Sequence, residues 1–264
     1  MLKTTLNRQN RKAAVLGVLL CAAAPLPAWA DGVVNVGIDY QRLTNGFGEW
    51  NGLYVRGSAW QRPQTVFNYE LVSAKRFGDQ GTFGSLGIQH TFNSVWYGTV
   101  TAGAGASTFI FPRWTADATV SRKWLPRGQL VTTVGAGTTR ATDGHRDVHG
   151  LLSAAWYASD KWVFEAGWRP NHSDPGAVRS GSAFAAATWG REGRQYWIVR
   201  HDVGREAYQL IGDNTALVDF PSRSTSLAWR KWWSARCGTH VQVEHYGNPN
   251  YERNGVQFAA FCNH

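Results

Sequence analysis

The chain has 264 residues and a formal net charge of +9, with 43% hydrophobic and only 17% charged residues, 14 Trp and 29 Gly. This aromatic-rich, weakly charged composition excludes a disordered chain, which would have few aromatic residues and a high net charge. A helix bundle is excluded as well, because the chain favours Trp, Tyr, Phe, Val, Thr and Gly over the helix formers Leu, Glu, Lys and Met.

Residues 1–30 have the pattern of a secretory signal peptide. The first twelve residues carry four basic and no acidic side chains, and an apolar run covers 13–24. Small residues at Ala28 and Ala30 predict cleavage before Asp31. The alternative, an uncleaved helical anchor, needs about 20 apolar residues. The mature chain, residues 31–264, keeps 23 basic against 18 acidic residues and shows no linker that would mark a second domain.

Runs of about ten residues, each followed by turn residues such as Asn45-Gly46 or Pro126, repeat along the mature chain. Many short strands joined by tight turns predict an all-β, antiparallel up-and-down barrel of about 12–14 strands. The fourteen predicted strands are 33–43, 49–61, 65–77, 81–92, 95–106, 114–124, 129–140, 148–158, 161–169, 180–190, 194–202, 223–235, 240–247 and 255–262.

The segment from Trp114 to Trp124 alternates most clearly. Its even-numbered residues are apolar apart from Arg122, and its odd-numbered residues are Thr, Asp, Ser and Lys. Ten residues of tilted strand rise about 25 Å, the height of the apolar band between the aromatic girdles of an outer-membrane barrel. Residues 161–169 alternate in the same way, with Trp162 and Trp168 on the apolar face. We therefore predict a transmembrane barrel whose girdle includes Trp114, Trp124, Trp162 and Trp168.

The alternative to a membrane barrel is a water-soluble sandwich or a lipocalin-type barrel. The low charge disfavours it, because about a quarter of the residues in a soluble protein are charged. The faces opposite the apolar ones are rich in Ser, Thr, Gly, Ala and Gln, as expected of a lumen. Further tryptophans fall near predicted strand ends, where interfacial belts form; they are Trp50, Trp60, Trp96, Trp156, Trp189 and Trp233.

An even strand number predicts that both termini lie on the periplasmic side of the outer membrane of a Gram-negative bacterium. The longer connections then fall on the outer side, over 107–112, 141–147, 171–179 and 203–222. Cys262 ends the last predicted strand and Cys237 lies in the turn before strand 240–247, both at the periplasmic rim. We expect them to form a disulfide in this oxidising compartment. Two buried free thiols are the alternative.

Polar residues on the inward faces of the predicted strands carry both signs of charge. In a narrow barrel these side chains would pair and plug the interior, whereas in a wider one they would line a hydrated path beside aromatic rings that stack on sugars. Twelve to fourteen strands lies between these cases, so both remain open. The predicted lumen-lining residues are Asn68, Glu70, Asp117, Glu165, Arg169, Arg230, Gln242 and Glu244.

Candidate chemistry is confined to loop residues. Three groups contain His with Ser or Asp, but sequence proximity alone does not establish the hydrogen bonds that a nucleophile requires. We assign no catalytic residue, metal site or cofactor, and the dispersed basic residues disfavour nucleic acid as a partner. The three groups are Asp143, His145, Asp147 and His149; His172, Ser173 and Asp174; and His201 with Asp202.

Three segments resemble the YaiO family of outer-membrane β-barrel proteins: 103–113, 156–168 and 229–236. The resemblance extends from Asp31 to the end and implies an outer-membrane barrel of about a dozen strands. Some members carry periplasmic repeat domains and accompany polysaccharide synthesis or export, which implies a glycan pore. This chain has no such repeat before the barrel. It also ends Phe261-Cys262-Asn263-His264, so that Phe261 would serve as the terminal aromatic residue for assembly.

We therefore expect a pore or accessory barrel for passive transport or polysaccharide export, and not an enzyme. Its expected partners are outer-membrane lipid, the barrel-assembly machinery and a polysaccharide or small solute in the lumen. One alternative is a hydrolase that acts on lipid or glycan at the rim. Another is a structural or adhesive barrel whose 203–222 loop contacts partners.

Overall fold

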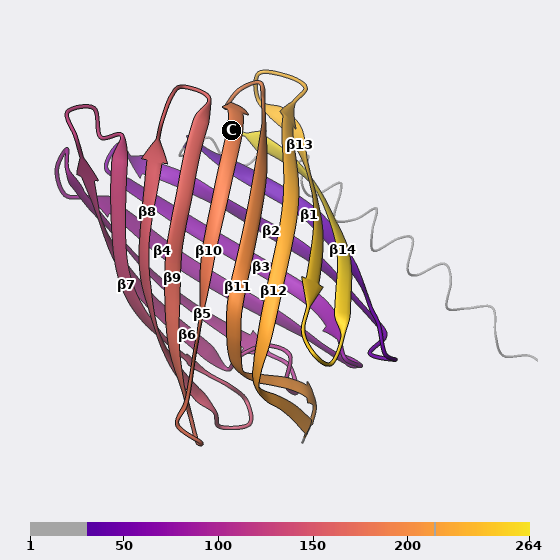
Figure 1. Cartoon of the computed structure of the whole chain (residues 1–264). Coiled ribbons are helices and arrows are strands. Elements are labelled where there is room, and N and C mark those ends of the chain that lie inside the picture. The colour runs from indigo at the N-terminus through magenta and orange to yellow at the C-terminus, as the bar shows by residue number, and fades with distance from the viewer. Residues whose placement is uncertain (1–30, 214) are drawn as a thin grey trace, which may run out of the picture.

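The computed structural model describes residues 31–213 and 215–264, which form one closed antiparallel barrel (Figure 1). The predicted signal peptide lies outside the described residues. The strands are β1 (Asp31–Leu43), β2 (Glu49–Arg62), β3 (Thr65–Arg76), β4 (Asp79–Thr91), β5 (Trp96–Ala106), β6 (Trp114–Trp124), β7 (Leu130–Arg140), β8 (Arg146–Tyr157), β9 (Trp162–Asp174), β10 (Val178–Arg191), β11 (Gln195–Gly212), β12 (Thr215–Trp232), β13 (Cys237–Gly247) and β14 (Glu252–Asn263).

Each strand pairs with its neighbours in the chain, and β1 pairs with β14 to close the barrel. Closure pairs the backbone groups of every strand, which a bilayer core demands because it offers no water. The structure confirms the predicted fold class and the count of fourteen strands. The described residues contain no helix long and apolar enough to cross a bilayer.

The outward face of the barrel is apolar. Side chains alternate between the two faces, and directly paired residues share a face. Leu86 is 72% exposed and Val100 is 63% exposed, and the register pairs their inward neighbours Gly87 and Thr101. Large apolar side chains remain exposed around the barrel, as expected of a surface that contacts lipid.

The two ends of the barrel are distinguished by the chain termini. Gly32 exchanges backbone hydrogen bonds of 3.0 Å with His264, so both described ends of the chain lie together. We call this the terminal end, which is the upper end in Figure 1, and the opposite one the far end.

The expected loop over 203–222 is wrong. β11 and β12 have 18 residues each and continue through most of it, and Gly204 pairs with Ser222. Gly204 and Pro221 have the local preferences of loop residues, but pairing between two adjacent strands outweighs them. Asp219 has a φ of 49° and lies at a break in the pairing between β11 and β12. The hairpin bends aside there, at the lower end of Figure 1. The expected loop over 171–179 likewise shrinks, because β9 runs to Asp174.

Candidate functional site: the lumen and its far mouth

The strand register places all eight predicted lumen-lining residues on the inward face. They share this face with small polar residues, whereas their chain neighbours such as Leu71, Phe164 and Val243 are exposed on the outside. Their positions are Asn68 and Glu70 on β3, Asp117 on β6, Glu165 and Arg169 on β9, Arg230 on β12, and Gln242 and Glu244 on β13.

Six inward arginines lie on β2, β3, β9, β11, β12 and β14, and each guanidinium lies near an aromatic ring. We call this side of the lumen the arginine wall. Cation–π contacts hold the long side chains against the wall while leaving their N–H donors available. The distances to the ring centroids are 4.0 Å for Arg56 over Tyr54, 5.2 Å for Arg76 over Trp50, 4.5 Å for Arg169 and 4.0 Å for Arg200 over Phe184, 3.6 Å for Arg230 over Phe261, and 4.6 Å for Arg253 over Trp50.

Carboxylates neutralise only part of the arginine wall. Asp202 accepts two hydrogen bonds of 2.7 Å from Arg200. In contrast, Arg56 donates to the amide oxygen of Gln257 at 3.3 Å, and Arg230 donates to that of Asn35 at 3.4 Å. Two guanidiniums of the wall therefore keep neutral hydrogen-bond partners. Arg169 and Arg253 also form ion pairs, at 3.5 Å to Asp202 and 2.6 Å to Glu244.

The opposite side of the lumen, on β4–β8, consists mainly of Ser, Thr and Gly, and we call it the hydroxyl wall. Ser121 and Thr133 lie 2.8 Å apart through their hydroxyls. His149 contacts Asp117 at 2.7 Å across the intervening strand, because Gly137 between them has no side chain that would occupy that space. The hydroxyl wall therefore differs from the arginine wall in the length and the charge of its side chains.

Among the cavities of the lumen, two border the hydroxyl wall. One of ≈ 550 Å³ lies in the far half, where Asp147, Asn171, Ser182 and Ser224 are among the residues that line it. Another of ≈ 510 Å³ lies at the terminal end, against the hydroxyl wall; its lining includes Gln89, Tyr97, Lys123 and Tyr157. Polar side chains predominate among the inward residues of both cavities, as expected of a path for hydrophilic solutes.

An aromatic cluster narrows the far mouth. Leu43, Trp50, Tyr246 and Tyr251 are buried there, and Leu217 of the bent hairpin packs against them. Trp50 is only 4% exposed, so the prediction that it joins an outward belt is wrong. The reason is register, since Trp50 shares the inward face of β2 with Tyr54.

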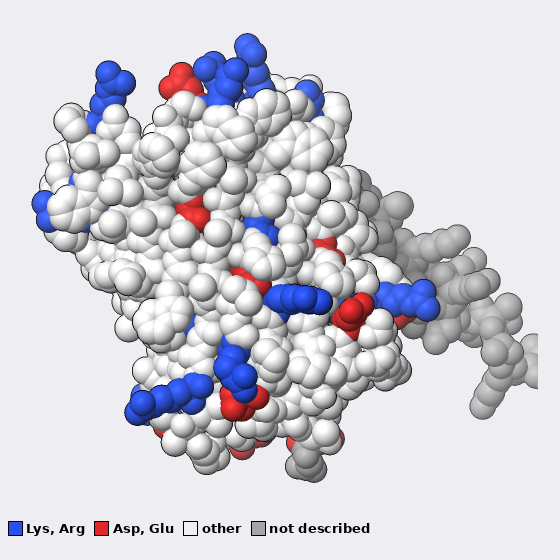
Figure 2. Space-filling model, viewed as in Figure 1, with Lys and Arg blue, Asp and Glu red and all other residues white. Residues whose placement is uncertain are grey.

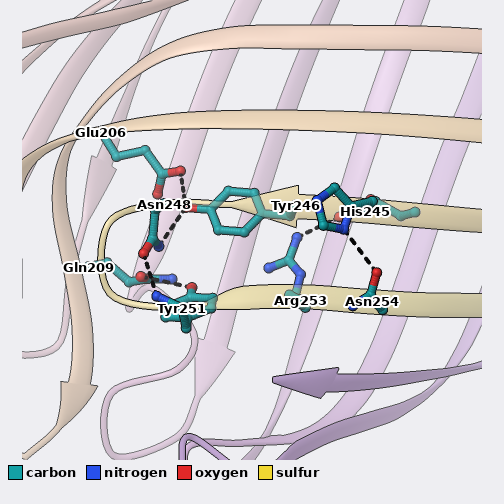
Figure 3. Close-up of polar contacts among 9 residues, drawn as sticks. Glu206, Gln209, His245, Tyr246, Asn248, Tyr251, Arg253 and Asn254 are labelled. Atoms are coloured by element: carbon teal, nitrogen blue, oxygen red, sulfur yellow. Dashed lines mark hydrogen bonds and ion pairs between the residues drawn. The ribbon is translucent and has the colours of Figure 1, made fainter. Parts of the chain in front are cut away.

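Polar contacts fix the β11–β12 hairpin to this cluster (Figure 3). The Tyr246 hydroxyl donates to Glu206 at 2.7 Å and accepts from Asn248 at 3.1 Å. The Tyr251 hydroxyl donates to Gln209 at 3.0 Å. One side of the hairpin is thus attached to the β13–β14 turn.

The other side of the hairpin reaches the β7–β8 loop. The Tyr208 hydroxyl donates to Asp143 at 2.7 Å, and its ring stacks on His145 with centroids 3.6 Å apart. Burial and the hydrogen bond to Asp143 raise the pKa of Tyr208 to about 12. Burial acts to raise the pKa of Asp143, but hydrogen bonds from Tyr208 and His145 outweigh it and lower the pKa below 3.8. Tyr208 also lines the far cavity, so the hairpin covers part of the mouth.

The three groups of loop residues considered for chemistry are separated by the fold. His145 pairs with Asp143 at the far mouth, and His149 pairs with Asp117 in the lumen. His172 pairs with Asp174 at 3.3 Å, whereas Ser173 is buried on the opposite face of the same strand. His201 faces outward and contacts the Thr225 hydroxyl at 2.8 Å, while Asp202 faces inward to Arg200. Among the described residues no serine hydroxyl contacts a histidine, and no cluster suited to a metal ion is found.

The tryptophans are distributed unevenly between the two ends. Trp124 and Trp162 lie at the terminal end, whereas Trp114 begins β6 at the far end and Trp168 lies part of the way along β9. Most of the other exposed tryptophans also lie at the terminal end: Trp96, Trp156, Trp189, Trp197 and Trp233. The terminal end also carries a disulfide between Cys237 and Cys262, which are directly paired in the register.

Arg56, Arg76, Arg200 and Arg253 belong to the arginine wall but are absent from the predicted lumen residues. For Arg56 the signal is present in the sequence, since Leu53 and Val55 mark the outward face of β2 by alternation. For Arg200 the apolar Ile198 on the same face obscures the alternation. Aromatic contacts from neighbouring strands, such as Phe184 beneath Arg200, are long-range and leave no local pattern.

Comparison with known proteins agrees with the architecture. A sequence profile described as the YaiO membrane beta barrel domain matches residues 32–209, more than half of the chain. The search for curated relatives found no match.

Several solved structures are similar in fold. "CymD monoaromatic hydrocarbon channel" has a TM-score of 0.58 at 6% identity, covering 89% of this chain and 88% of that chain. "Bacterial polysaccharide outer membrane secretin" has a TM-score of 0.55 at 11% identity, covering 89% and 99%. A loop-deletion mutant of OmpT, an outer membrane protein of Vibrio cholerae, has a TM-score of 0.52 at 8% identity, covering 89% and 99%. At these identities the similarity shows the barrel fold alone.

Proposed function

Because the chain belongs to the YaiO family of membrane β-barrels, we propose that it is a channel of the Gram-negative outer membrane that passes hydrophilic solutes or polysaccharide without catalysis of its own. Its lipid-facing surface contacts the bilayer, and its insertion requires the barrel-assembly machinery. Both termini then face the periplasm, as is usual for outer-membrane barrels with an even number of strands.

The contrast between the two luminal walls is the observation that carries this proposal. A barrel that is only a structural anchor has no need to hold guanidiniums against aromatic rings on one wall and to line the other wall with short side chains. In this lumen the Arg56 and Arg230 donors have only neutral partners, and the wall opposite them is lined mainly by short side chains. Solute hydroxyl and acidic groups can exchange hydrogen bonds along such a surface.

The more specific form of the proposal is that the lumen passes a polysaccharide. Aromatic rings, guanidiniums and hydroxyls are the groups that bind sugars by stacking and hydrogen bonding, and all three line this lumen. One structure of similar fold is described as a bacterial polysaccharide outer membrane secretin.

Single-channel recording of the refolded protein in planar bilayers tests the proposal. We expect a steady open level, and a lower conductance for Thr101→Trp, which places a large side chain on the hydroxyl wall between Gly87 and Asp117. The matched control is Val100→Trp, whose side chain faces lipid and should leave conductance unchanged. A folded barrel, verified by heat-modified gel mobility, that conducts no current would overturn the proposal.

A further inference from the structure

Two basic residues lie on the outward face at the far end, and we call them the far-end patch: Arg140 and Arg146. Arg140 on β7 lies directly opposite Arg146 on β8. Trp114 is paired with Arg140 on its other side. The two cations therefore lie at one level on adjacent strands.

The charge of the far-end patch is not balanced by the protein. Like charges directly opposite each other destabilise a sheet. Among the described residues neither Arg140 nor Arg146 forms an ion pair, and Arg146 has only a 3.3 Å hydrogen bond to Thr138. Asp174, which is in register with Arg146 on β9, pairs with His172 instead. An anion from outside the chain would remove this repulsion.

Two outward cations at the terminal end, in contrast, have partners within the protein. Arg122 lies 3.7 Å from the ring centroid of Trp124 and 5.2 Å from that of Trp96. Arg191 forms an ion pair of 3.3 Å with Asp160. Figure 2 shows Lys and Arg gathered toward both ends of the visible face. Unlike Arg122 and Arg191, neither Arg140 nor Arg146 has an ion pair or a cation–π contact among the described residues.

An apolar surface lies directly beside the far-end patch. Moving from it toward the middle of the barrel, the outward residues are Ala116 and Ala118 on β6 and the exposed Val148 on β8. A molecule that fits both parts has anionic groups next to apolar chains. This is the chemistry of a membrane lipid whose headgroup carries phosphate.

We propose that the far-end patch binds the phosphates of lipid A, the glycolipid of the outer leaflet. One guanidinium can donate two parallel hydrogen bonds to the oxygens of a phosphate. Strands lie about 4.8 Å apart, so arginines on adjacent strands reach more than one phosphate, as a glycolipid with two phosphates requires. Its acyl chains lie on the adjacent apolar surface. This site is independent of conduction through the lumen.

Native mass spectrometry of the purified protein tests this site. The unmodified protein is titrated with bisphosphorylated lipid A, with the same lipid after removal of its phosphates, and with phosphatidylglycerol. We expect lipid A to bind at least tenfold more tightly than either of the other two. Equal binding of the dephosphorylated lipid would overturn the phosphate site, and equal binding of phosphatidylglycerol would overturn its assignment to the glycolipid.

Substitutions locate the site on the barrel. Arg140→Gln combined with Arg146→Gln should weaken lipid A binding at least tenfold, whereas Arg122→Gln at the terminal end should leave it unchanged. Equal losses in both variants would mean that binding follows total charge, which contradicts a specific site. The titration of the unmodified protein decides the question even where the double variant does not fold. Conductance should be the same in all variants, which separates this test from that of the channel.

Discussion

At the terminal end of the barrel, tryptophans surround the outward face and a disulfide joins Cys237 to Cys262, whereas at the far end a bent hairpin covers part of the mouth. The terminal end is held by a covalent bond and by apolar contact with the membrane interface. The far end is held by hydrogen bonds such as that between Tyr208 and Asp143. The comparison shows that one end of the molecule is fixed covalently and the other by non-covalent contacts.

The disulfide should give the largest effect. Cys237→Ser combined with Cys262→Ser removes a cross-link between residues 25 apart, and a loop of that size is worth about 3 kcal/mol. We expect a corresponding fall in the free energy of unfolding, measured by urea titration of heat-modified gel mobility. The unmodified protein in reductant is the control and should show the same fall; an unchanged urea midpoint in both would contradict a stabilising role.

A smaller and local effect is expected from Tyr208→Phe. The variant keeps the ring on His145 but removes the hydrogen bond to Asp143, worth about 1 kcal/mol. Faster hydrogen exchange in loop 141–145 and a noisier open current should follow, with little change in global unfolding. Tyr157→Phe is the matched control, because that hydroxyl at the terminal end has no hydrogen bond to a described residue. Equal effects of the two substitutions would contradict a stabilising role of the hydrogen bond between Tyr208 and Asp143.

The smallest effect is the pH dependence of the same contact. The pKa of Asp143 is lowered, so its contribution is complete above its unfolded pKa of 3.8 and is lost as the pH falls through the lower folded value. The pKa of Tyr208 is raised to about 12, so its contribution is complete below 10 and is lost as the pH rises through 12. Hydrogen exchange in loop 141–145 should therefore show the strongest protection, relative to intrinsic rates, between these limits. A protection factor that stays constant below pH 3.8 would contradict the role of Asp143.

Local sequence pattern predicted the strands well and the far end poorly. The alternation from Trp114 to Trp124 needs only the two-residue period of a strand, and the structure has β6 over those residues. Val203 to Ser222 contains Gly, Pro and Asp, whose local preferences are those of a loop, yet it forms a bent hairpin. Strand pairing and the contacts of Leu217 and Tyr208 with distant loops decide its course, and such contacts leave no periodic signal.

Composition and two-residue periodicity were thus sufficient to predict an outer-membrane barrel of fourteen strands, because lipid on one side and a polar lumen on the other impose a different residue type on each face. They also placed Glu70, Asp117 and Arg230 inside. Only the tertiary structure decided which inward side chains meet. The contact of Asp117 with His149 across Gly137, the burial of Trp50 and the attachment of the hairpin all depend on register and curvature, which bring together residues far apart in the chain.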